Sequence, residues 1–357
     1  MRVLSVVGAR PQFVKLAPIS HSLAGRAEHV IVHTGQHYDD LMSDVFFRDL
    51  GIPTPDVNLA IGSGKHGAQT GSMIVGLEPI FEQYDPDWVL VYGDTNSTLA
   101  AAITAVKLHI PVAHLEAGLR SFNRRMPEEH NRVLTDHASD LLLAPTQVAM
   151  THLHTEGLEK GARLVGDVMT DVLFTVRDKV IASGHELPEG VPSNDYYVAT
   201  IHRPDNTDNP ERLGAIISAL AGLPRPVVLL THPRLRDLAK RHGIALAQGA
   251  VQSTSPLPYP ELIAAVMGST GVITDSGGLQ KEAFLLRVPA TTIRPETEWV
   301  ETLEQDWNVL VDDISELASA VTRPAPPPTQ FSPYGQGNAA EKVVTALLEN
   351  RRPRRQR

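Results

Sequence analysis

The stretch Val3-Leu-Ser-Val-Val7, followed by Gly8-Ala-Arg-Pro-Gln-Phe-Val-Lys15, decides the fold class of this sequence. A short valine-rich run is typical of a buried strand, and the glycine and polar residues after it predict a tight turn into a helix. Similar short runs alternate with longer helical patterns along most of the chain, which predicts an α/β fold with parallel sheets. We expect strands at Val3–Val7, Val30–His33, Trp88–Tyr92, Val112–Leu115, Leu141–Ala144, Tyr197–Ile201, Val227–Leu230, Gly271–Thr274 and Ala290–Ile293, with helices between them, for example at Leu99–Leu108 and Glu128–Ala138.

A segment rich in proline and glycine, Leu187–Asn194, separates these strands into two series. Two series joined by one linker predict two Rossmann-like lobes that face each other across a cleft, with ligands at the carboxyl ends of the strands. We place the first lobe at residues 1–170 and the second at residues 171–335. The proline-rich segment Thr322–Pro328 cannot be helical, so it is expected to form a stiff connector to a last helix near Ala339–Glu349.

Composition narrows the class of protein. A length of 357 residues suits two domains, and 42% hydrophobic with 20% charged residues is ordinary for a globular protein. The charge balance, 32 basic against 41 acidic residues, gives −9, which does not favour a nucleic-acid partner. The absence of cysteine excludes disulfides, thiolate zinc sites and a cysteine nucleophile. We recognise no secretory signal and no apolar run long enough to span a membrane, so a cytoplasmic protein without a membrane partner is expected.

Three turns of the first lobe carry carboxylates directly after predicted strands or at a helix start. Asp94 follows Trp88–Tyr92, and Glu116 follows Val112–Leu115. Glu128 comes just after Pro127, in the first turn of a predicted helix. Each acid alone fits a bland role as a helix cap or a surface acid. Together they favour a catalytic carboxylate cluster, because like charges in one cleft raise proton affinity and suit acid–base work.

Other turns favour the binding of an anion. Gly8 at a strand end is expected to let a ligand approach the backbone, with Arg10 and Lys15 adding positive charge; the alternative is an ordinary turn with surface cations. The basic tail Arg351–Arg357 is interpreted as a frayed, solvated terminus.

The second lobe offers one histidine and one glycine-rich turn. His202 ends a predicted strand that faces the cleft, which favours a catalytic role over a structural one. The run Asp275-Ser276-Gly277-Gly278 after Gly271–Thr274 is expected to present backbone N–H groups to a diphosphate, with tight helix packing as the alternative. Glu282, about one helical turn later, is placed to accept hydrogen bonds from a ribose.

Two further patterns are interpreted as uninformative. The run Gly62–Gly67 matches G-x-G-x-x-G but falls after the second helix, so we expect a flexible loop rather than a dinucleotide site. His114-x-Glu116 can in principle chelate, yet no H-E-x-x-H or comparable pair occurs among the 15 histidines. We therefore expect no metal.

Several motifs occur in the order found in one family. The chain resembles the non-hydrolysing UDP-N-acetylglucosamine 2-epimerases over essentially its whole length. That resemblance implies the two-lobed glycosyltransferase-B fold with the last helix, residues 338–350, packing back on the first lobe. It also implies interconversion of UDP-GlcNAc and UDP-ManNAc without metal or cofactor, in a homodimer. The motifs that carry it are Gly8–Lys15, Thr34–His37, Tyr92–Thr95, His114–Arg120, Met126–Arg132, His202-Arg203 and Asp275–Gly278.

The resemblance further implies a mechanism and a role for each motif residue. UDP is eliminated to leave 2-acetamidoglucal and then adds back, with the C2 proton delivered to the other face. Asp94, Glu116 and Glu128 are the implied acid–base carboxylates. His202, Arg10 and Lys15 are implied to stabilise the leaving UDP. The remaining implied substrate contacts are Arg132, Ser276, Gly277 and Gly278, with Glu282 on the ribose and Tyr259 stacked on uracil.

The sequence departs from the best-known branch of the family, which opens Gly-Thr-Arg-Pro-Glu where this chain has Gly8-Ala-Arg-Pro-Gln12. With Met42–Phe47 and His202–Asn206, it looks like the sub-branch that includes epimerases of UDP-2,3-diacetamido-uronic acids. A UDP-diacetamido-uronate 2-epimerase is thus one alternative. A glycosyltransferase of the same fold is another; it would need an acceptor groove and one base rather than carboxylates on three loops. A third is a catalytically inactive sensor of nucleotide sugars, which retention of the four candidate catalytic residues disfavours.

Overall fold

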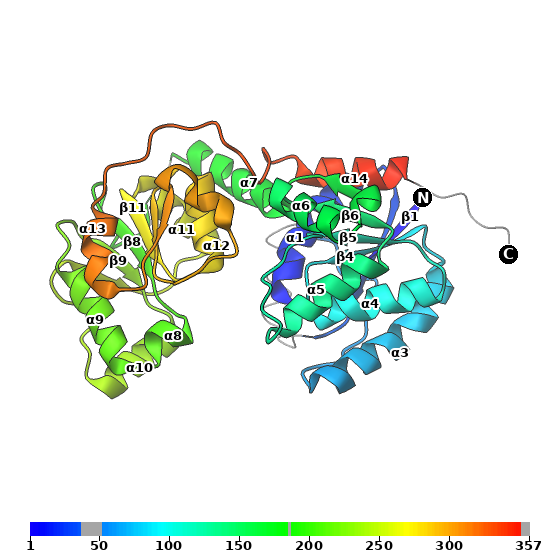
Figure 1. Cartoon of the computed structure of the whole chain (residues 1–357), viewed down its shortest axis with the longest axis horizontal. Coiled ribbons are helices and arrows are strands. Elements are labelled where there is room, and N and C mark those ends of the chain that lie inside the picture. The colour runs from blue at the N-terminus through cyan, green and yellow to red at the C-terminus, as the bar shows by residue number, and fades with distance from the viewer. Residues whose placement is uncertain (37–51, 185–186, 351–357) are drawn as a thin grey trace. The chain divides into compact units, whose positions relative to one another are not determined.

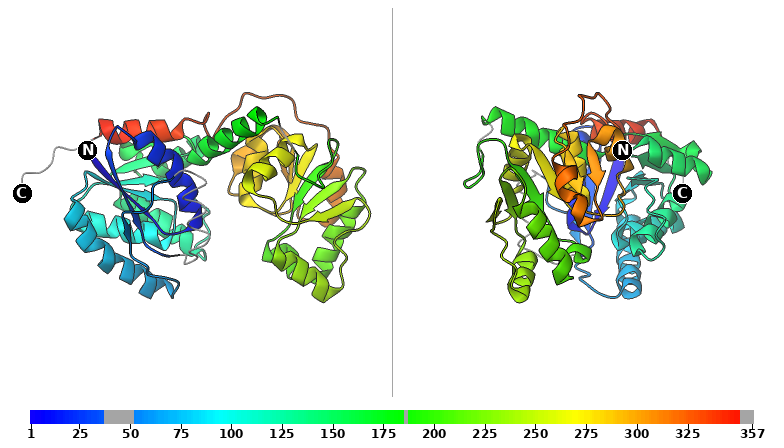
Figure 2. Two further views of the ribbon diagram at one scale, coloured as in Figure 1. Left: turned by 180° about the vertical axis from the view of Figure 1, so that it is seen from behind. Right: turned by 60° about the vertical axis from the view of Figure 1, so that its left-hand side comes forward.

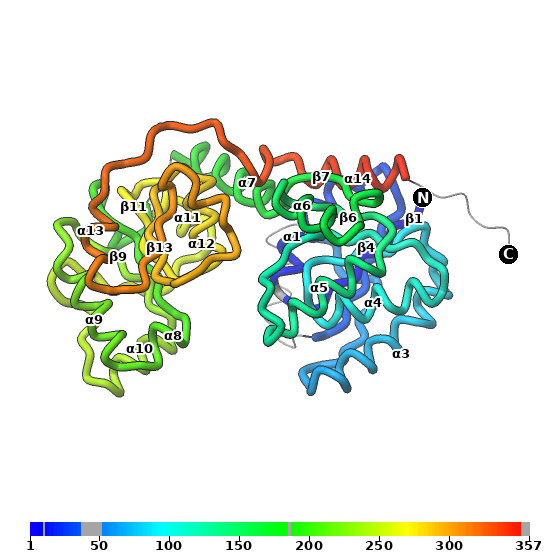
Figure 3. The backbone as a smooth tube through the Cα atoms, viewed as in Figure 1, coloured from blue at the N-terminus to red at the C-terminus, as the bar shows by residue number. Residues whose placement is uncertain are grey.

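The computed structural model describes residues 1–36, 52–184 and 187–350, apart from the side chain of Arg10. The chain divides into two compact units, one formed by Met1–Phe174 with Ser332–Arg357 and the other by Thr175–Phe331. Figure 3 shows the chain leaving the first unit through helix α7 (Val168–Ala182) and returning to it before helix α14 (Ala339–Glu349). No helix in the described ranges is both long and apolar enough to cross a bilayer.

The first unit is built on a parallel sheet whose described strands run in the order β3-β2-β1-β4-β5-β6-β7 (Figure 1). Strands β1 and β4 pair in parallel with Val3 opposite Trp88, so their carboxyl ends lie at the same end of the sheet. The strands are β1 (Arg2–Val7), β2 (Glu28–His33), β3 (Val57–Asn58), β4 (Trp88–Tyr92), β5 (Val112–Leu115), β6 (Leu141–Ala144) and β7 (Ala162–Leu164). The described helices are α1 (Arg10–Leu23), α3 (His66–Tyr84), α4 (Asn96–Lys107), α5 (Pro127–Ala138), α6 (Gln147–Thr155), α7 (Val168–Ala182) and α14 (Ala339–Glu349), with a 3-10 turn at Glu159–Gly161.

Both faces of this sheet are buried, which explains its continuous apolar strands. Along β1, Val3 and Val7 pack on one side with α1 and α14. Leu4 and Val6 pack on the other side with α3 and α4. Side chains on a strand alternate between faces, so one valine-rich run supplies two cores.

The second unit repeats this plan with the strand order β10-β9-β8-β11-β12-β13 among the residues described. All its pairings are parallel, and apolar clusters cover both faces. The strands are β8 (Tyr197–Thr200), β9 (Val227–Leu230), β10 (Val251–Thr254), β11 (Gly271–Thr274), β12 (Ala290–Thr292) and β13 (Asn308–Leu310). The helices are α8 (Pro204–Thr207), α9 (Pro210–Ala221), α10 (Pro233–His242), α11 (Tyr259–Gly268), α12 (Gly277–Leu285) and α13 (Leu317–Val321), with 3-10 segments at Val300–Asp306 and Ile314–Glu316.

The C-terminal helix α14 lies against α1 of the first unit (Figures 1 and 2). Trp88 of β4 donates an indole N–H to the carbonyl of Leu347 at 3.1 Å, and Val343 and Leu347 are fully buried. The first turn of α14 is fixed by Asp171 of α7, whose carboxylate accepts from the amides of Ala339 and Ala340 at 3.0 and 2.8 Å.

The predicted α/β fold with two parallel sheets is confirmed, and nine predicted strands are present with ends shifted by two residues at most. Four short strands, β3, β7, β10 and β13, were not predicted. The predicted loop Gly62–Gly67 is wrong at its end, because His66 and Gly67 begin α3. The last helix matches its expected bounds, and the proline-rich connector is not helical. The motif Met42–Phe47 and the tail Arg351–Arg357 lie outside the described residues.

Candidate active site

The turn between β1 and α1 is closed by Gln12, whose side chain is buried. Its Oε1 accepts from the amides of Gly8 and Ala9 at 2.8 and 3.0 Å, and its Nε2 donates to the carbonyl of Tyr92 at 2.7 Å. These two turn amides are therefore satisfied inside the protein. An ionised glutamate at this position could accept from the two amides but could not donate to Tyr92, whose carbonyl also accepts from Thr98 Oγ1 at 2.7 Å.

Side chains of the protein fill the space beside Gly8 where a β-carbon would lie, and the expected approach of a ligand to its backbone stays a prediction. A β-carbon on Gly8 would lie 2.0 Å from Thr34 Oγ1 and 2.3 Å from Ser97 Oγ. These two hydroxyls hydrogen-bond each other at 2.8 Å. The glycine is required because the protein's own side chains fill the space beside it. Arg10 begins α1, but its side chain lies outside what the structure describes.

Asp94 follows β4 and does not cap α4. The cap is Thr95, which accepts from the amide of Thr98 at 3.3 Å. The carboxylate of Asp94 instead pairs with Arg132 of α5, while Asn131 donates to its backbone carbonyl at 2.9 Å. Asp94 is partly exposed and is held from two sides, so its side chain is available to a ligand in a fixed position.

Glu116 follows β5 in an unusual backbone conformation. Its φ is +70°, in the left-handed region that side chains with a β-carbon seldom adopt, and only 8% of the residue is exposed. Its amide donates to the carbonyl of Leu143 at 3.1 Å, which holds the turn in place. Strained conformations of this kind concentrate at functional sites.

The carboxylate of Glu116 forms an ion pair with Lys15 of α1. Both lie over Gly93, where a β-carbon would be 3.3 Å from Glu116 Oε2 and 3.3 Å from Lys15 Nζ. Burial acts to lower the pKa of Lys15, but Glu116, with Asp94 and Asp167 further away, raises it overall. The structure therefore places Asp94 and Glu116 around one cation.

Helix α5 brings the third predicted acid to this region. Pro127 begins the helix and Glu128 lies in its first turn, as predicted. Glu128 is exposed and lies three and four residues before Asn131 and Arg132, hence on the helix face that contacts Asp94. Arg132 bridges Asp94 and Glu129 through Nη2 and Nη1, and its guanidinium has five N–H donors, so its predicted contact with substrate does not require either pair to open.

The neighbouring Glu129 is buried and structural. It accepts from the amide and hydroxyl of Ser121 at 2.9 and 2.8 Å and from the amide of Phe122 at 2.9 Å. Burial alone would raise its pKa, but these donors and Arg132 lower it overall. Glu129 thus fixes the loop before α5 that delivers Glu128.

In the second unit, His202 is held by Asp275. The fully buried carboxylate of Asp275 accepts from the amides of His202 and Arg203, from Asn206 Nδ2 and from His202 Nδ1 at 3.1 Å. Burial works against its charge, but these donors lower the pKa of Asp275 overall. The half-exposed imidazole therefore has a fixed orientation with Nε2 left for a ligand.

The glycine-rich turn begins α12 as predicted. Ser276 caps it by accepting from the amide of Leu279 at 3.3 Å. A β-carbon on Gly277 would lie 2.3 Å from Glu298 Oε1. Glu298 also pairs with the buried Arg294 at 2.9 Å. A carboxylate of the protein thus sits at the helix N-terminus where we expected a diphosphate, a position that favours negative charge.

Tyr259 and Glu282, the residues predicted to contact the nucleoside, are neighbours. The hydroxyl of Tyr259 donates to Glu282 Oε1 at 2.9 Å. Burial raises the pKa of Glu282, and burial together with Glu282 raises the pKa of Tyr259. Both residues are only partly exposed, so a ligand meets a preformed hydrogen-bonded pair.

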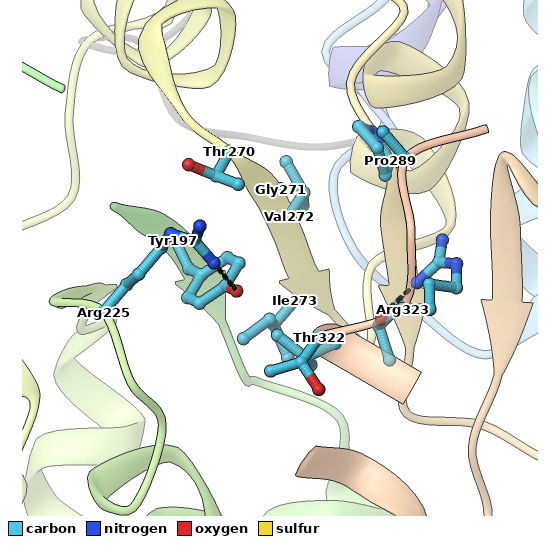
Figure 4. A pocket seen from close by; sticks show the side chains of 12 residues that line it. Tyr197, Arg225, Thr270, Gly271, Val272, Ile273, Pro289, Thr322 and Arg323 are labelled. Carbon is cyan, nitrogen blue, oxygen red and sulfur yellow. Dashed lines mark hydrogen bonds between the residues drawn. The ribbon is translucent and has the colours of Figure 1, made fainter. Parts of the chain in front are cut away.

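Among the described residues of the second unit, cavities lie at both ends of the parallel strands. One of about 280 Å³ follows the carboxyl ends of the strands and is lined by Arg203, Asn206 and Arg294, next to His202. The other, of about 260 Å³, lies at the strand starts, between Tyr197, Gly271 and Arg323 (Figure 4). Only the first lies beside the predicted site residues. Within the described ranges, no group of three metal-ligating side chains is gathered.

A model of the UDP-N-acetylglucosamine 2-epimerase family matches residues 21–348 of this chain. The chain belongs to that family. It is 45% identical to the UDP-2,3-diacetamido-2,3-dideoxy-D-glucuronate 2-epimerase of Pseudomonas aeruginosa, covering 98% of this chain and 100% of that protein. It is 43% identical to a UDP-N-acetylglucosamine 2-epimerase homolog of Methanococcus maripaludis, covering 97% and 99%.

The crystal structure of the UDP-GlcNAc 2-epimerase of Methanocaldococcus jannaschii in complex with UDP-GlcNAc and UDP superposes with a TM-score of 0.81. It is 36% identical, and the match covers 98% of this chain and 100% of that one. The family resemblance, the glycosyltransferase-B type of fold and the classification as an isomerase are confirmed. The roles of individual residues remain predictions.

Three residues of this family site were not predicted as functional. Asp275 orients His202, Glu129 fixes the loop that delivers Glu128, and Glu298 occupies the start of α12. Asp275 carries the same signal as Glu116, an acid directly after an apolar strand, so the sequence could have identified it. Glu298 carries no such signal, because only the fold brings it to Gly277.

Proposed function

We propose that this chain is a non-hydrolysing epimerase that inverts C2 of UDP-GlcNAc to give UDP-ManNAc. The observation that carries the proposal is Glu116, an ion-paired acid in left-handed backbone conformation at the carboxyl end of a parallel sheet. Its pairing with Lys15 beside Asp94 provides carboxylates fixed in place and open to proton exchange. The UDP-GlcNAc-bound relative supports the choice of nucleotide sugar.

The proposed reaction is an elimination followed by re-addition. C2 has no adjacent carbonyl, so its proton is not acidic enough for simple removal. One carboxylate accepts the C2 proton while the C1–O bond breaks, giving UDP and 2-acetamidoglucal. UDP then adds back to C1 as a second acid, on the opposite face, protonates C2. Asp94, Glu116 and Glu128 are the proposed proton-transfer groups, all in the first unit.

The departing diphosphate requires positive charge and hydrogen-bond donors. We assign His202, oriented by Asp275, together with Ser276, Gly277 and Gly278 at the start of α12. Tyr259 and Glu282 are assigned to the nucleoside. Lys15 lies against Glu116, and its ammonium has three N–H donors, so its proposed action on the diphosphate does not need that ion pair to open. Arg10 keeps its proposed role from the sequence motif alone.

A second substrate has its own support. The relative from Pseudomonas aeruginosa acts on UDP-2,3-diacetamido-2,3-dideoxy-D-glucuronate, and its 45% identity exceeds the 39% of the UDP-N-acetylglucosamine 2-epimerase of Methanocaldococcus jannaschii. The reaction at C2 is the same for both substrates. They differ in the substituents at C3 and C6 of the sugar.

Proton NMR of the purified protein tests both the reaction and the substrate. UDP-GlcNAc and the UDP-diacetamido-uronate are incubated separately in D₂O without any acceptor. We expect a 2-epimer carrying deuterium at C2, because the proton is exchanged with solvent between the two faces. Turnover only with an added acceptor would favour a glycosyltransferase, and release of free sugar would indicate a hydrolysing enzyme. Epimerisation of the uronate alone would assign the second substrate.

The resemblance also suggests a homodimer that works in the cytoplasm. Light scattering coupled to size-exclusion chromatography tests the dimer, for which a 38.8 kDa chain should give about twice that mass. A monomeric mass with full activity would contradict this part of the proposal and leave the reaction untouched.

A further inference from the structure

The imidazole of His114 in β5 is fully buried and lies between two hydrogen-bond acceptors. Nδ1 is 2.6 Å from Asp136 Oδ1, and Nε2 is 2.7 Å from the carbonyl oxygen of Gly93. A carbonyl oxygen cannot donate. Asp136 Oδ2 accepts from Arg120 Nη1 and from the amide of Gly118, and these two donors favour the ionised carboxylate, which cannot donate either. A neutral ring has one N–H and would leave a lone pair facing an acceptor.

The carboxylate of Asp136 is satisfied on all sides. Besides His114, it accepts from Arg120 Nη1 at 2.7 Å and from the amide of Gly118 at 3.0 Å. Arg120 in turn donates through Nε and Nη2 to Glu156 at 2.8 and 2.7 Å. A doubly protonated His114 and Arg120 balance Asp136 and Glu156, so the buried network is neutral as a whole. Buried charges persist only when they are paired and hydrogen-bonded in this way.

The network touches each loop that carries a proposed proton-transfer acid. Gly93 directly precedes Asp94. Gly118 lies two residues after Glu116, within the same turn. Asp136 belongs to α5, whose first turn holds Glu128. His114 thus contacts the turn of Asp94 and helix α5 directly, and Asp136 connects both to the turn of Glu116 through Gly118.

We propose that His114 is held as an imidazolium, with a hydrogen on both ring nitrogens, and acts as a positioning residue that fixes the turns of Asp94 and Glu116 relative to α5. This inference deepens the proposed epimerase function and rests on it. His114 does not touch substrate in this role. The protonated Nε2 of His114 donates to the carbonyl oxygen of Gly93, and this hydrogen bond holds the peptide segment that carries Asp94.

The charged side chains around His114 belong to four segments of the chain: α5, α1, the loop after β5 and the turn after α6. Asp136 faces it from α5, and Arg120 and Glu156 follow behind that carboxylate. On the far side of Gly93 lie Lys15 of α1 and Glu116, which pair with each other. Only Asp136 contacts the ring directly among these groups.

Nitrogen-15 NMR of histidine ring signals tests the protonation state in the wild-type chain. His29 is the internal control: burial lowers its pKa to about 4, so it should show the pattern of a neutral ring at pH 8. We expect His114 to show two protonated nitrogens at the same pH, and a signal that disappears in His114→Gln. A neutral pattern for His114 at pH 8 would overturn the proposal whatever the enzyme's substrate is.

Kinetics of two variants test the positioning role. His114→Gln can still donate near the Nε2 position to Gly93, whereas His114→Asn can donate only near the Nδ1 position to Asp136. Misplacement of catalytic groups by about 1 Å costs on the order of 10²-fold in rate. We expect kcat to fall about 10-fold in His114→Gln and about 100-fold in His114→Asn, with KM and UDP affinity within about twofold. Equal losses in the two variants, or a rise in KM alone, would overturn positioning through Gly93.

Asp136→Asn supplies a readout that loss of packing would not give. In this variant the pH profile of kcat should gain an ionisation between about pH 5 and 8, the range in which an uncompensated histidine titrates. A profile that parallels the wild type would contradict the assignment of the cation. If the wild-type chain shows no epimerase activity on either UDP-sugar, the proposed function fails, while the NMR result for His114 still decides its protonation.

Discussion

Among single residues, Glu116 combines a buried carboxylate, a cation partner and a left-handed backbone. Glu116→Gln keeps size and most hydrogen bonding but removes proton exchange. We expect kcat to fall by a factor of about 10² to 10⁴, the range typical of general acid–base groups, with UDP affinity preserved. Steady-state kinetics and calorimetry of UDP binding measure the two effects. Glu341→Gln, an exposed acid on α14, is the matched control. A near-normal kcat in Glu116→Gln would remove this residue from the mechanism.

Glu298 and Glu282 of the second unit allow predictions of opposite sign. The carboxylate of Glu298 occupies the start of α12, where an incoming diphosphate would compete with it. One charge near a helix N-terminus contributes about 0.3–1 kcal/mol, so Glu298→Gln should tighten UDP binding about two- to fivefold. Glu282→Ala should weaken UDP binding, because it loses the proposed ribose contact. Calorimetric titration with UDP measures both. Weaker binding in Glu298→Gln would show that Glu298 supports the nucleotide instead of competing with it.

For the elements, the errors in strand prediction have one physical cause. The four strands that were not predicted, β3, β7, β10 and β13, are the outer strands of the two sheets in the described chain. An outer strand pairs on one side only and is partly exposed, as in Val251-Gln-Ser-Thr254, whose two central residues face solvent. Such segments lack the continuous apolar run that marks an inner strand. Every inner strand was predicted, because both faces of each sheet are buried.

For the site, too, some features could be predicted from the sequence, and others depend on how the chain folds. Asp94 and Glu116 could be identified because each is an acid in the turn that follows an apolar strand. In a parallel sheet these turns lie at the same end of the strands. The ion pairs that hold them could not be predicted, because Lys15 and Glu116 are 101 positions apart and only the packing of α1 joins them. The left-handed backbone of Glu116, whose amide donates to the carbonyl of Leu143, carries no turn signature in the sequence either.

The first turn of α14 is capped by a side chain from another helix of the first unit. Asp171 of α7 accepts from two amides of the first turn of α14, and neither amide has a partner within the helix. Asp171→Ala should lower the free energy of unfolding by about 1–2 kcal/mol, the usual effect of removing a cap. Urea denaturation measures this difference. Asp178→Ala, an exposed position on the same helix, should change it by less than about 0.5 kcal/mol. Equal effects at the two positions would contradict the capping role.

Across the whole molecule, the proposed functions divide between the two units. The proposed proton-transfer acids and their supporting network lie in the first unit together with Arg10 and Lys15, and the other residues proposed for the diphosphate and the nucleoside lie in the second. Variants of the acids in the first unit should therefore change kcat with UDP affinity intact, whereas variants at α12 should change UDP affinity first. The buried acids also differ in the direction in which their pKa values shift. Glu129, Asp136 and Asp275 have lowered pKa values, whereas burial raises the pKa values of Asp171 and Glu282.

Stability toward acid follows from these directions. A carboxyl whose pKa is lower in the folded state than in the unfolded chain binds protons more readily when unfolded. Its contribution is complete above its unfolded value, near 4, and is lost as the pH falls through the folded value. For Asp136 the wild-type chain should therefore have a higher Tm than Asp136→Asn at pH 7, and this gap should narrow steadily below about pH 5. Calorimetry at fixed ionic strength measures the gap, with Asp178→Asn as the exposed control. A gap that stays constant down to pH 3 would show that Asp136 stabilises the fold by packing rather than by its charge.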